Sequence, residues 1–312
     1  MSLEELNRRI KTTKDIGNIV HTMKMLSSAS VGQYDKALQS LNQYVRTIFD
    51  AFHGLFSQES FQYTPSPPTS TDAKPLAILI GSDNGLVGKF NTDLIEFAHQ
   101  SLTLKHPDVQ PYIISVGKRI SVTEQIPDAE LVASYPISNT LKEIAPMAAQ
   151  LLNQIDQIVS HHKINFVYLF ANQRKGNATF CPQMHQLMPL PQTEFKKINK
   201  PDWTGHTLPF VSANPHTLFS ALVKEYLIVL LSHDLVASLA SEHYTRMIHM
   251  QEAEQNIEET LKQFNLEYQQ LRQTQITDEL IDIISGAEEM NKQKTQSPLD
   301  STKKKSKNNK RN

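Results

Sequence analysis

Two long stretches, one at each end of the chain, carry apolar residues at alternating spacings of three and four. Between Ser241 and Ala287 the apolar positions are Met250, Ile257, Leu261, Phe264, Tyr268 and Leu271. From Ser2 to about Phe56 a near-heptad spacing links Leu3, Leu6, Ile10, Val20, Met23, Tyr34, Leu38, Leu41, Val45, Ile48, Phe52 and Leu55. Charged and amide residues fill the positions between. Stripes this narrow are typical of a coiled-coil seam and predict that the two terminal helices pack on each other.

Capping residues mark where these helices begin. Ser2 and Glu5 form a capping box, and Asn214 places a capping amide before Pro215 at the first helical position of the second helix. Both helices leave one middle domain, so we expect them to lie antiparallel.

The second terminal helix is predicted to outrun the first. At 1.5 Å per residue the first spans roughly 80 Å, and the second, from Pro215 to about Gly286, roughly 105 Å. The overhang carries an apolar face that something outside this chain must cover. Its residues are Ile276, Leu280, Ile283 and Ile284.

The middle of the chain alternates short apolar runs with amphipathic stretches. Strands are predicted at residues 76–80, 112–116, 131–135 and 166–170, helices at 92–104 and 141–160, and an edge hairpin at 179–191. This alternation predicts a small, mainly parallel sheet flanked by helices, a Rossmann-like domain. The fold class is therefore α/β: an antiparallel coiled coil of the N- and C-terminal helices plus a small central α/β domain.

Composition divides the chain into five segments. We expect an N-terminal coiled-coil helix at 1–57, a Ser-, Thr- and Pro-rich linker at 58–74, the central domain at 75–210, a C-terminal coiled-coil helix at 211–290 and a basic disordered tail at 291–312. A tail of this charge is usually just solvated, and contact with anionic lipid or nucleic acid is the less favoured alternative.

Charge and cysteine content narrow the class of protein. The 31 Lys and Arg residues nearly balance 32 Asp and Glu residues, and without its basic tail the body is acidic, which argues against nucleic acid as a partner. The single Cys181 excludes an internal disulfide and fits a reducing compartment. No apolar run reaches the ~20 residues that cross a bilayer, and no signal or transit peptide is evident, so any membrane association must come through a partner.

The turn Gly81-Ser82-Asp83-Asn84-Gly85-Leu86-Val87-Gly88-Lys89-Phe90 is the most suggestive candidate for chemistry. Glycine-bearing turns between strand and helix hold phosphate in nucleotide-binding folds. This turn departs from the Walker pattern at Asp83 and Phe90, and it contains no Gly-x-Gly. We favour a structural turn built on Asp83, Gly85 and Gly88. No cofactor is implied, and no histidine cluster has the spacing of metal ligands.

Two further segments each have two interpretations, one structural and one functional. The small residues Ser27 to Gly32 indicate a close helix crossing, or else a waist against which a surrounding structure slides. Four polar side chains project from the overhang: Arg272, Gln273, Thr277 and Glu279. They are either solvated surface groups or, if other chains surround the overhang, the hydrogen-bonding groups that fix one rotational setting of the helix.

Motifs at both ends and at the middle turn resemble the gamma subunit of the rotary F-type ATP synthase. The N-terminal motif is Leu6 to Lys14 followed by Met23-Lys24-Met25, and the middle one is Ser82 to Gly88. The C-terminal signature comprises Ser241-Glu242-His243, Arg246-Met247, Tyr268, Arg272-Gln273, Ile276-Thr277, Glu279-Leu280 and Ser285-Gly286-Ala287. The chain departs from the family pattern at Val87, where Cys is common, and in its uncharged Ser30 to Gln33.

The resemblance implies a central stalk that turns inside a ring of three alpha and three beta subunits, standing on the membrane c-ring with the epsilon subunit. It implies that Arg272, Gln273, Thr277 and Glu279 contact the beta-subunit catch loops. It likewise places Met23, Lys24 and Arg246 at the beta levers. The implied location is peripheral, at the cytoplasmic face of a bacterial inner membrane. The subunit itself is expected to be non-catalytic, with no direct small-molecule substrate.

Two alternatives of other classes stay open from the residues alone. A self-contained coiled-coil scaffold would bury its own apolar tip, and a nucleotide-binding α/β enzyme would use the turn around Gly85.

Overall fold

The computed structural model describes residues 2–58, 74–107, 109–121, 126, 129–138, 140–175, 180–190 and 211–295. The predicted linker falls outside these residues except at its two ends, as does the tail beyond Thr295. The chain divides into two compact units, residues 21–252 and residues 1–20 with 253–312. We call the first the body and the second the end coil.

The helices and strands follow one another as predicted. They are α1 (Leu3–Phe56), β1 (Pro75–Ile80), α2 (Phe90–Lys105), β2 (Tyr112–Val116), β3 (Glu130–Tyr135), α4 (Leu141–His162), β4 (Phe166–Gln173), β5 (Cys181–Met188) and α6 (Pro215–Thr295). The predicted cap of α6 is present, since the backbone amides of His216 and Thr217 donate to Asn214 Oδ1. In the first helix Glu5 N donates to Ser2 Oγ, as the capping box requires.

The body is built on a five-stranded sheet in the order β3-β2-β1-β4-β5. β1 pairs in parallel with β2 and β4, and β2 pairs in parallel with β3. β5 pairs antiparallel with β4 at one edge. Residues 181–188 form this single edge strand, so the hairpin predicted within 179–191 was wrong, because the segment pairs with β4 and not with itself. All six residues of β1 are buried because helices cover both faces of the sheet.

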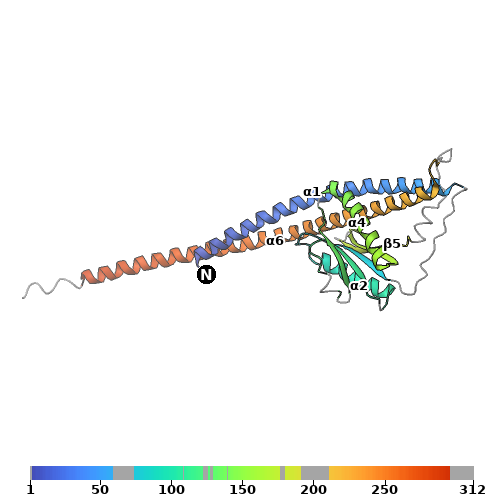
Figure 1. Cartoon of the computed structure of the whole chain (residues 1–312). Helices are drawn as coiled ribbons and strands as arrows, with labels where there is room; N and C mark the ends of the chain where they lie inside the picture. The colour runs from blue at the N-terminus through green and yellow to red at the C-terminus, as the bar shows by residue number, and fades with distance from the viewer. Residues whose placement is uncertain are drawn as a thin grey trace, which may run out of the picture. The chain divides into compact units, whose positions relative to one another are not determined.

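Helices lie on both faces of the sheet (Figure 1), and each face has its own apolar core. On one face α2 packs Leu94, Ile95 and Ala98 against Ala77 and Leu79 of β1. On the other face α4 and α6 pack against Ile78, the strand residue between them. α1 contributes Tyr34 to this second core. Alternate β1 side chains therefore anchor the terminal helices and α2 to the same sheet.

Within the body, α1 and α6 run antiparallel. Tyr34 of α1 lies beside His243 of α6, with ring centroids 5.4 Å apart. Further along α1, Phe52 packs with Phe219, which lies much earlier in α6, and their ring centroids are 6.0 Å apart. Numbers that rise along one helix thus fall along the other, which confirms the predicted orientation.

The end coil pairs the start of α1 with α6 in the same sense. Leu6 is 1% exposed and Ile10 is 7% exposed, and a Cβ added at Gly17 would lie 3.2 Å from Ile257. Glu5, Arg8, Arg9, Thr12 and Thr13 share a surface groove with Phe264. The predicted seam residues of α6, from Ile257 to Leu271, are partly buried, while nearly all residues between them are exposed. The seam was therefore correctly predicted.

α6 runs past its predicted end. The helix continues through Gly286 to Thr295, into the segment expected to be a disordered tail. A helical Gly costs only about 1 kcal/mol relative to Ala, and Gly286 has no neighbour within 4 Å that its substitution would meet. The good helix formers Ala287, Glu288, Glu289 and Met290 follow it and favour continuation. In the described part of the chain, no helix has the length and hydropathy needed to span a bilayer.

Candidate functional site

The turn after β1 ties three parallel strands together at their carboxyl ends. Asp83 Oδ1 accepts backbone amides from Lys118, after β2, at 2.9 Å and from Ile137, after β3, at 3.1 Å. Asn91 at the start of α2 accepts from Ser82 N and donates to Ser82 Oγ. Asp83 therefore occupies the sheet edge where a nucleotide phosphate binds in related architectures, and its charge would repel a phosphate. These bonds support a structural role for the turn and argue against the nucleotide-enzyme alternative.

Only one of the two predicted turn glycines occupies a position that needs glycine. Gly88 has φ +58°, and a Cβ there would lie 2.9 Å from His249 Nε2. Gly85 meets nothing within 4 Å. The left-handed residue beside it is Leu86, with φ 63°, and its side chain is 59% exposed. An exposed leucine in this conformation is unusual, and the sequence pattern did not predict it.

Arg246 lies against this turn and is not on the surface. Its Nε donates to the carbonyl oxygen of Gly85 at 3.3 Å, and its guanidinium also pairs with Glu242 one helical turn earlier. Arg246 is 4% exposed and Glu242 1% exposed. The structure thus brings together two predicted features, the turn and the C-terminal signature. It differs from the prediction that Arg246 presents its side chain to a partner, because the buried Glu242 carboxylate holds it inside.

Burial dominates the electrostatics of this part of α6. Burial raises the pKa of Glu242, with Arg246 opposing the rise and Asp83 adding to it. Burial also lowers the pKa of the neighbouring His243 to about 4, assisted by the charge of Arg246. Neither ring nitrogen of His243 has a hydrogen-bond partner. His243 is therefore neutral near pH 7 and serves as a packing partner of Tyr34.

Met23 and Lys24 lie in the part of α1 that belongs to the body, and both are partly buried. The next two side chains are open to solvent, Met25 at 56% and Leu26 at 65% exposure. Ser27, which follows, is 3% exposed and supports close helix packing at the small-residue patch. Exposed apolar residues beside a buried position mark this face of α1 as a candidate contact surface.

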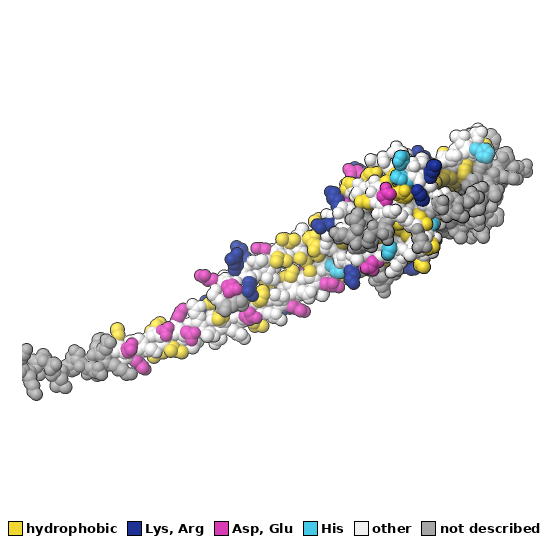
Figure 2. Space-filling view, turned by 60° about the horizontal axis from the view of Figure 1, so that its bottom comes forward, with side chains coloured by type: hydrophobic (Ala, Val, Ile, Leu, Met, Phe, Trp, Pro, Cys, Tyr) yellow, Lys and Arg dark blue, Asp and Glu magenta, His cyan; other side chains and the backbone are white. Residues whose placement is uncertain are grey.

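The overhang of α6 is a candidate contact surface in the end coil. From Arg272 to Asn291 every residue is exposed, including Gln273, Thr277 and Glu279. Thr277 Oγ1 donates back to the Gln273 carbonyl at 2.9 Å, and Glu279 accepts from Gln275. Acidic and apolar side chains lie side by side along this segment (Figure 2). Exposed large apolar residues here are Ile276, Leu280, Ile281, Ile283, Ile284 and Met290.

No group of three or more His, Cys, Asp or Glu side chains among the described residues is arranged to hold a metal ion. Sequence reasoning missed Glu242 as the partner of Arg246, although their spacing of four on a helix predicts contact. It also missed Asn91, which bonds Ser82 nine residues earlier, and Asp234, whose partners Gln173 and His185 lie on strands β4 and β5 of the sheet.

Comparison with known proteins gives one consistent result. The family described as ATP synthase matches residues 2–290. An ATP synthase gamma chain of Hydrogenobaculum sp. (strain Y04AAS1) is 24% identical over 296 residues, which cover 93% of this chain and 99% of the relative. A gamma chain of Staphylococcus aureus (strain JH9) is 24% identical over 292 residues, covering 92% and 98%.

Solved structures agree on the fold. A chain of the Euglena gracilis mitochondrial ATP synthase rotor, in rotational state 1, has a TM-score of 0.61 at 15% identity, covering 88% of this chain and 98% of its own. A central-stalk and c-ring structure from Tetrahymena thermophila mitochondrial ATP synthase contains a chain with a TM-score of 0.51 at 18% identity, covering 75% and 99%. The family match extends over nearly the whole chain, and this chain belongs to the gamma chains of the ATP synthase family.

Proposed function

We propose that the chain acts as a non-catalytic shaft, which couples ion-driven rotation to ATP synthesis or hydrolysis at sites on partner subunits. The observation that carries this proposal is the overhang. Seam residues of α6 are partly buried as far as Leu271, and all residues from Arg272 to Asn291 are exposed. Five isoleucine and leucine side chains in that segment, Ile276, Leu280, Ile281, Ile283 and Ile284, are 48–68% exposed. A helix end of this character needs a surrounding apolar surface.

Arg272, Gln273, Thr277 and Glu279 are the groups that we assign to the beta-subunit catch loops. Their exposure leaves them available to a partner, and hydrogen bonds and charge pairs give the directionality that apolar contacts lack. Each of three beta sites would meet a different side of the same helix. The shaft interacts with both the open and the closed form of each beta site. It can change the affinity of that site only by the difference between these two interaction energies.

For the beta levers we assign Met23 and Lys24, together with the exposed Met25 and Leu26 that extend the same surface. Arg246 takes a supporting part in this proposal. It holds the carbonyl oxygen of Gly85, and it thereby fixes the turn that carries the exposed Leu86.

The partners follow from the same role. We assign three alpha and three beta subunits to the ring that surrounds the α6 overhang. We assign the epsilon subunit and the membrane c-ring as binding partners of the body. The shaft would then be a peripheral component at the cytoplasmic face of a bacterial inner membrane, with no nucleic acid and no small-molecule substrate of its own.

Reconstitution tests the proposal directly. The chain combined with alpha and beta subunits should yield a complex in which ATP hydrolysis depends on its presence. A self-contained scaffold would instead remain a monomer or homodimer on sizing in the presence of those subunits.

A further inference from the structure

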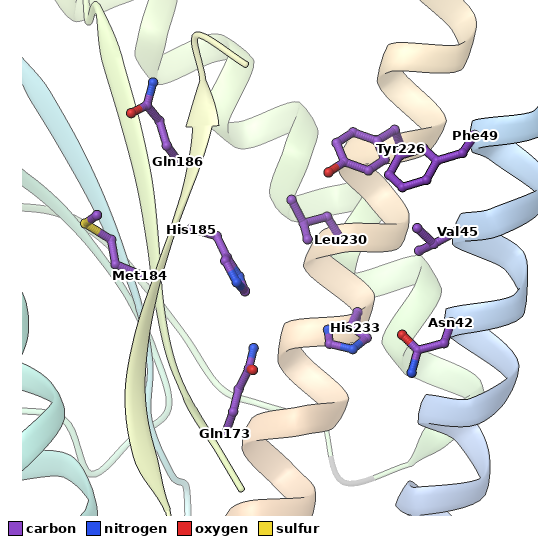
Figure 3. A pocket seen from close by; sticks show the side chains of 10 residues that line it. All are labelled: Asn42, Val45, Phe49, Gln173, Met184, His185, Gln186, Tyr226, Leu230 and His233. Atoms are coloured by element: carbon purple, nitrogen blue, oxygen red, sulfur yellow. The ribbon is translucent and has the colours of Figure 1, made fainter. Parts of the chain in front are cut away.

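The body contains a cavity of about 500 Å³ between α1, α6 and the β4–β5 pair. None of the residues assigned to the rotor contacts lines it. Side chains from all four elements surround it (Figure 3), and they are Asn42, Val45, Phe49, Gln173, Met184, His185, Gln186, Tyr226, Leu230 and His233. This volume is within the range of small-molecule sites.

A buried carboxylate organises the polar end of this cavity. Asp234 is fully buried, and its Oδ2 accepts from His185 Nδ1 at 2.5 Å. Its Oδ1 accepts from His233 Nδ1 and from Gln173 Nε2, each at 3.0 Å. Burial by itself raises the pKa of Asp234, but the bonds and charges of His185 and His233 outweigh it and hold that pKa below its ordinary range. Asp234 is therefore ionised and accepts all three bonds.

The ionised carboxylate determines which ring nitrogen of each histidine is held by a hydrogen bond. A buried carboxylate without a compensating cation is strongly unfavourable, and the imidazoles of His185 and His233 are the side chains in contact with it that can carry a positive charge. Asp234 accepts a hydrogen bond from Nδ1 of His233, so Nε2 is the nitrogen of that ring that can bond to a ligand. The His233 side chain is 23% exposed and lines the cavity. An imidazolium there offers an Nε2 proton to an anion.

The opposite end of the cavity is apolar and aromatic. Phe49 of α1 and Tyr226 of α6 have ring centroids 5.6 Å apart, and Val45 and Leu230 lie beside them. Among the lining residues that the structure describes, only His185, His233 and Tyr226 are ionisable. One end of the cavity thus suits an anion and the other suits a flat apolar ring.

We propose that this cavity is a binding site for a small aromatic carboxylate, with the carboxylate on His233 and the ring against Phe49, Tyr226 and Leu230. The site is independent of the rotor contacts. Because α1, α6 and the edge strand β5 all line it, a bound ligand would tie the terminal helices to the sheet.

Calorimetric titration of the full-length chain with 2-naphthoate tests this site, with the neutral 2-naphthamide as the matched probe. We expect the carboxylate to bind at least about tenfold more tightly than the amide. His233→Gln should weaken naphthoate binding about tenfold or more, while His99→Gln, on the exposed side of α2, should leave it unchanged.

Val45→Phe tests the cavity independently of the charged cluster. The larger side chain fills the apolar end, and Asp234 and both histidines are unchanged. Circular dichroism verifies that each variant is folded. Loss of naphthoate binding in a folded Val45→Phe protein supports the site. Absence of binding to the wild type, equal affinity for both probes, or unchanged binding in Val45→Phe overturns it.

Discussion

Arg246 Nε donates to the carbonyl oxygen of Gly85 at 3.3 Å, joining the middle of α6 to the turn that follows β1. The same guanidinium neutralises Glu242, and both side chains are almost completely buried. A buried pair of this kind adds little net stability as a whole, but removing one member leaves an uncompensated charge.

Arg246→Ala should therefore destabilise the body by about 3–5 kcal/mol, measured by urea denaturation. Arg174→Ala is the matched control, since Arg174 pairs with Asp35 at 3.0 Å with about a third of each side chain exposed. That exposed pair should be worth less than about 1 kcal/mol. Equal losses for the two variants would show that Arg246 has no special part in fixing the turn.

Gly88→Ala and Gly85→Ala form a second matched pair. The first places a Cβ at φ +58° and 2.9 Å from His249 Nε2, whereas the second meets nothing within 4 Å. We expect Gly88→Ala to cost about 1–2 kcal/mol and Gly85→Ala less than about 0.5 kcal/mol. Thermal unfolding of the two proteins measures the difference, and a reversed order would contradict the geometry of the turn.

His243 should make the body acid-sensitive. Its folded pKa is about 4 against an ordinary 6.5, so the unfolded chain binds more protons between these values. The stability contributed by the neutral imidazole is fully present above pH 6.5 and is lost as the pH falls toward 4. The maximum loss of unfolding free energy from this group is about 3 kcal/mol.

His243→Phe keeps a ring beside Tyr34 and removes this titration. The difference in unfolding free energy between pH 7 and pH 4.5 should be smaller in the variant than in the wild type by about 2 kcal/mol. All other ionisable groups contribute to both proteins and cancel. The same pH dependence in both proteins would rule out His243 as its source.

Arg272→Ala combined with Gln273→Ala tests the catch contact. Both side chains are exposed in α6, so the chain should fold and assemble as before, while ATPase activity of the reconstituted complex falls several-fold because transition-state contacts worth about 1–2 kcal/mol are lost. Gln269→Ala with Gln270→Ala, two exposed positions just before them, is the control. Unchanged turnover in the first variant would exclude the catch assignment.

The terminal helices and the sheet were predictable because their signals are local and periodic. Leu6, Ile10, Phe52 and Leu55 were all expected on the seam, and all are buried. The strands were found because a sheet covered on both faces requires continuous apolar runs such as Leu76 to Ile80. The C-terminal helix was predicted to stop at residue 290 because the residues after it were assigned to a basic tail, whereas α6 continues to Thr295.

The candidate site was less predictable because its contacts join distant parts of the chain. Nothing local to Arg246 indicates that Gly85 accepts its Nε proton, and nothing near Asp234 indicates that His185 lies 2.5 Å away. The left-handed conformation of Leu86 runs against residue preference, so a pattern that assigns turns to glycine selects Gly85 instead.

Rotation of the assembled complex is the most direct test of the proposed role. A bead can be attached to a cysteine at Leu104, whose side chain is 84% exposed on α2, in a Cys181→Ser background, with the beta subunits fixed to a surface. We expect the bead to turn continuously in one direction when ATP is supplied and to stop when it is removed. A bead that stays still while the same complexes hydrolyse ATP would contradict the account.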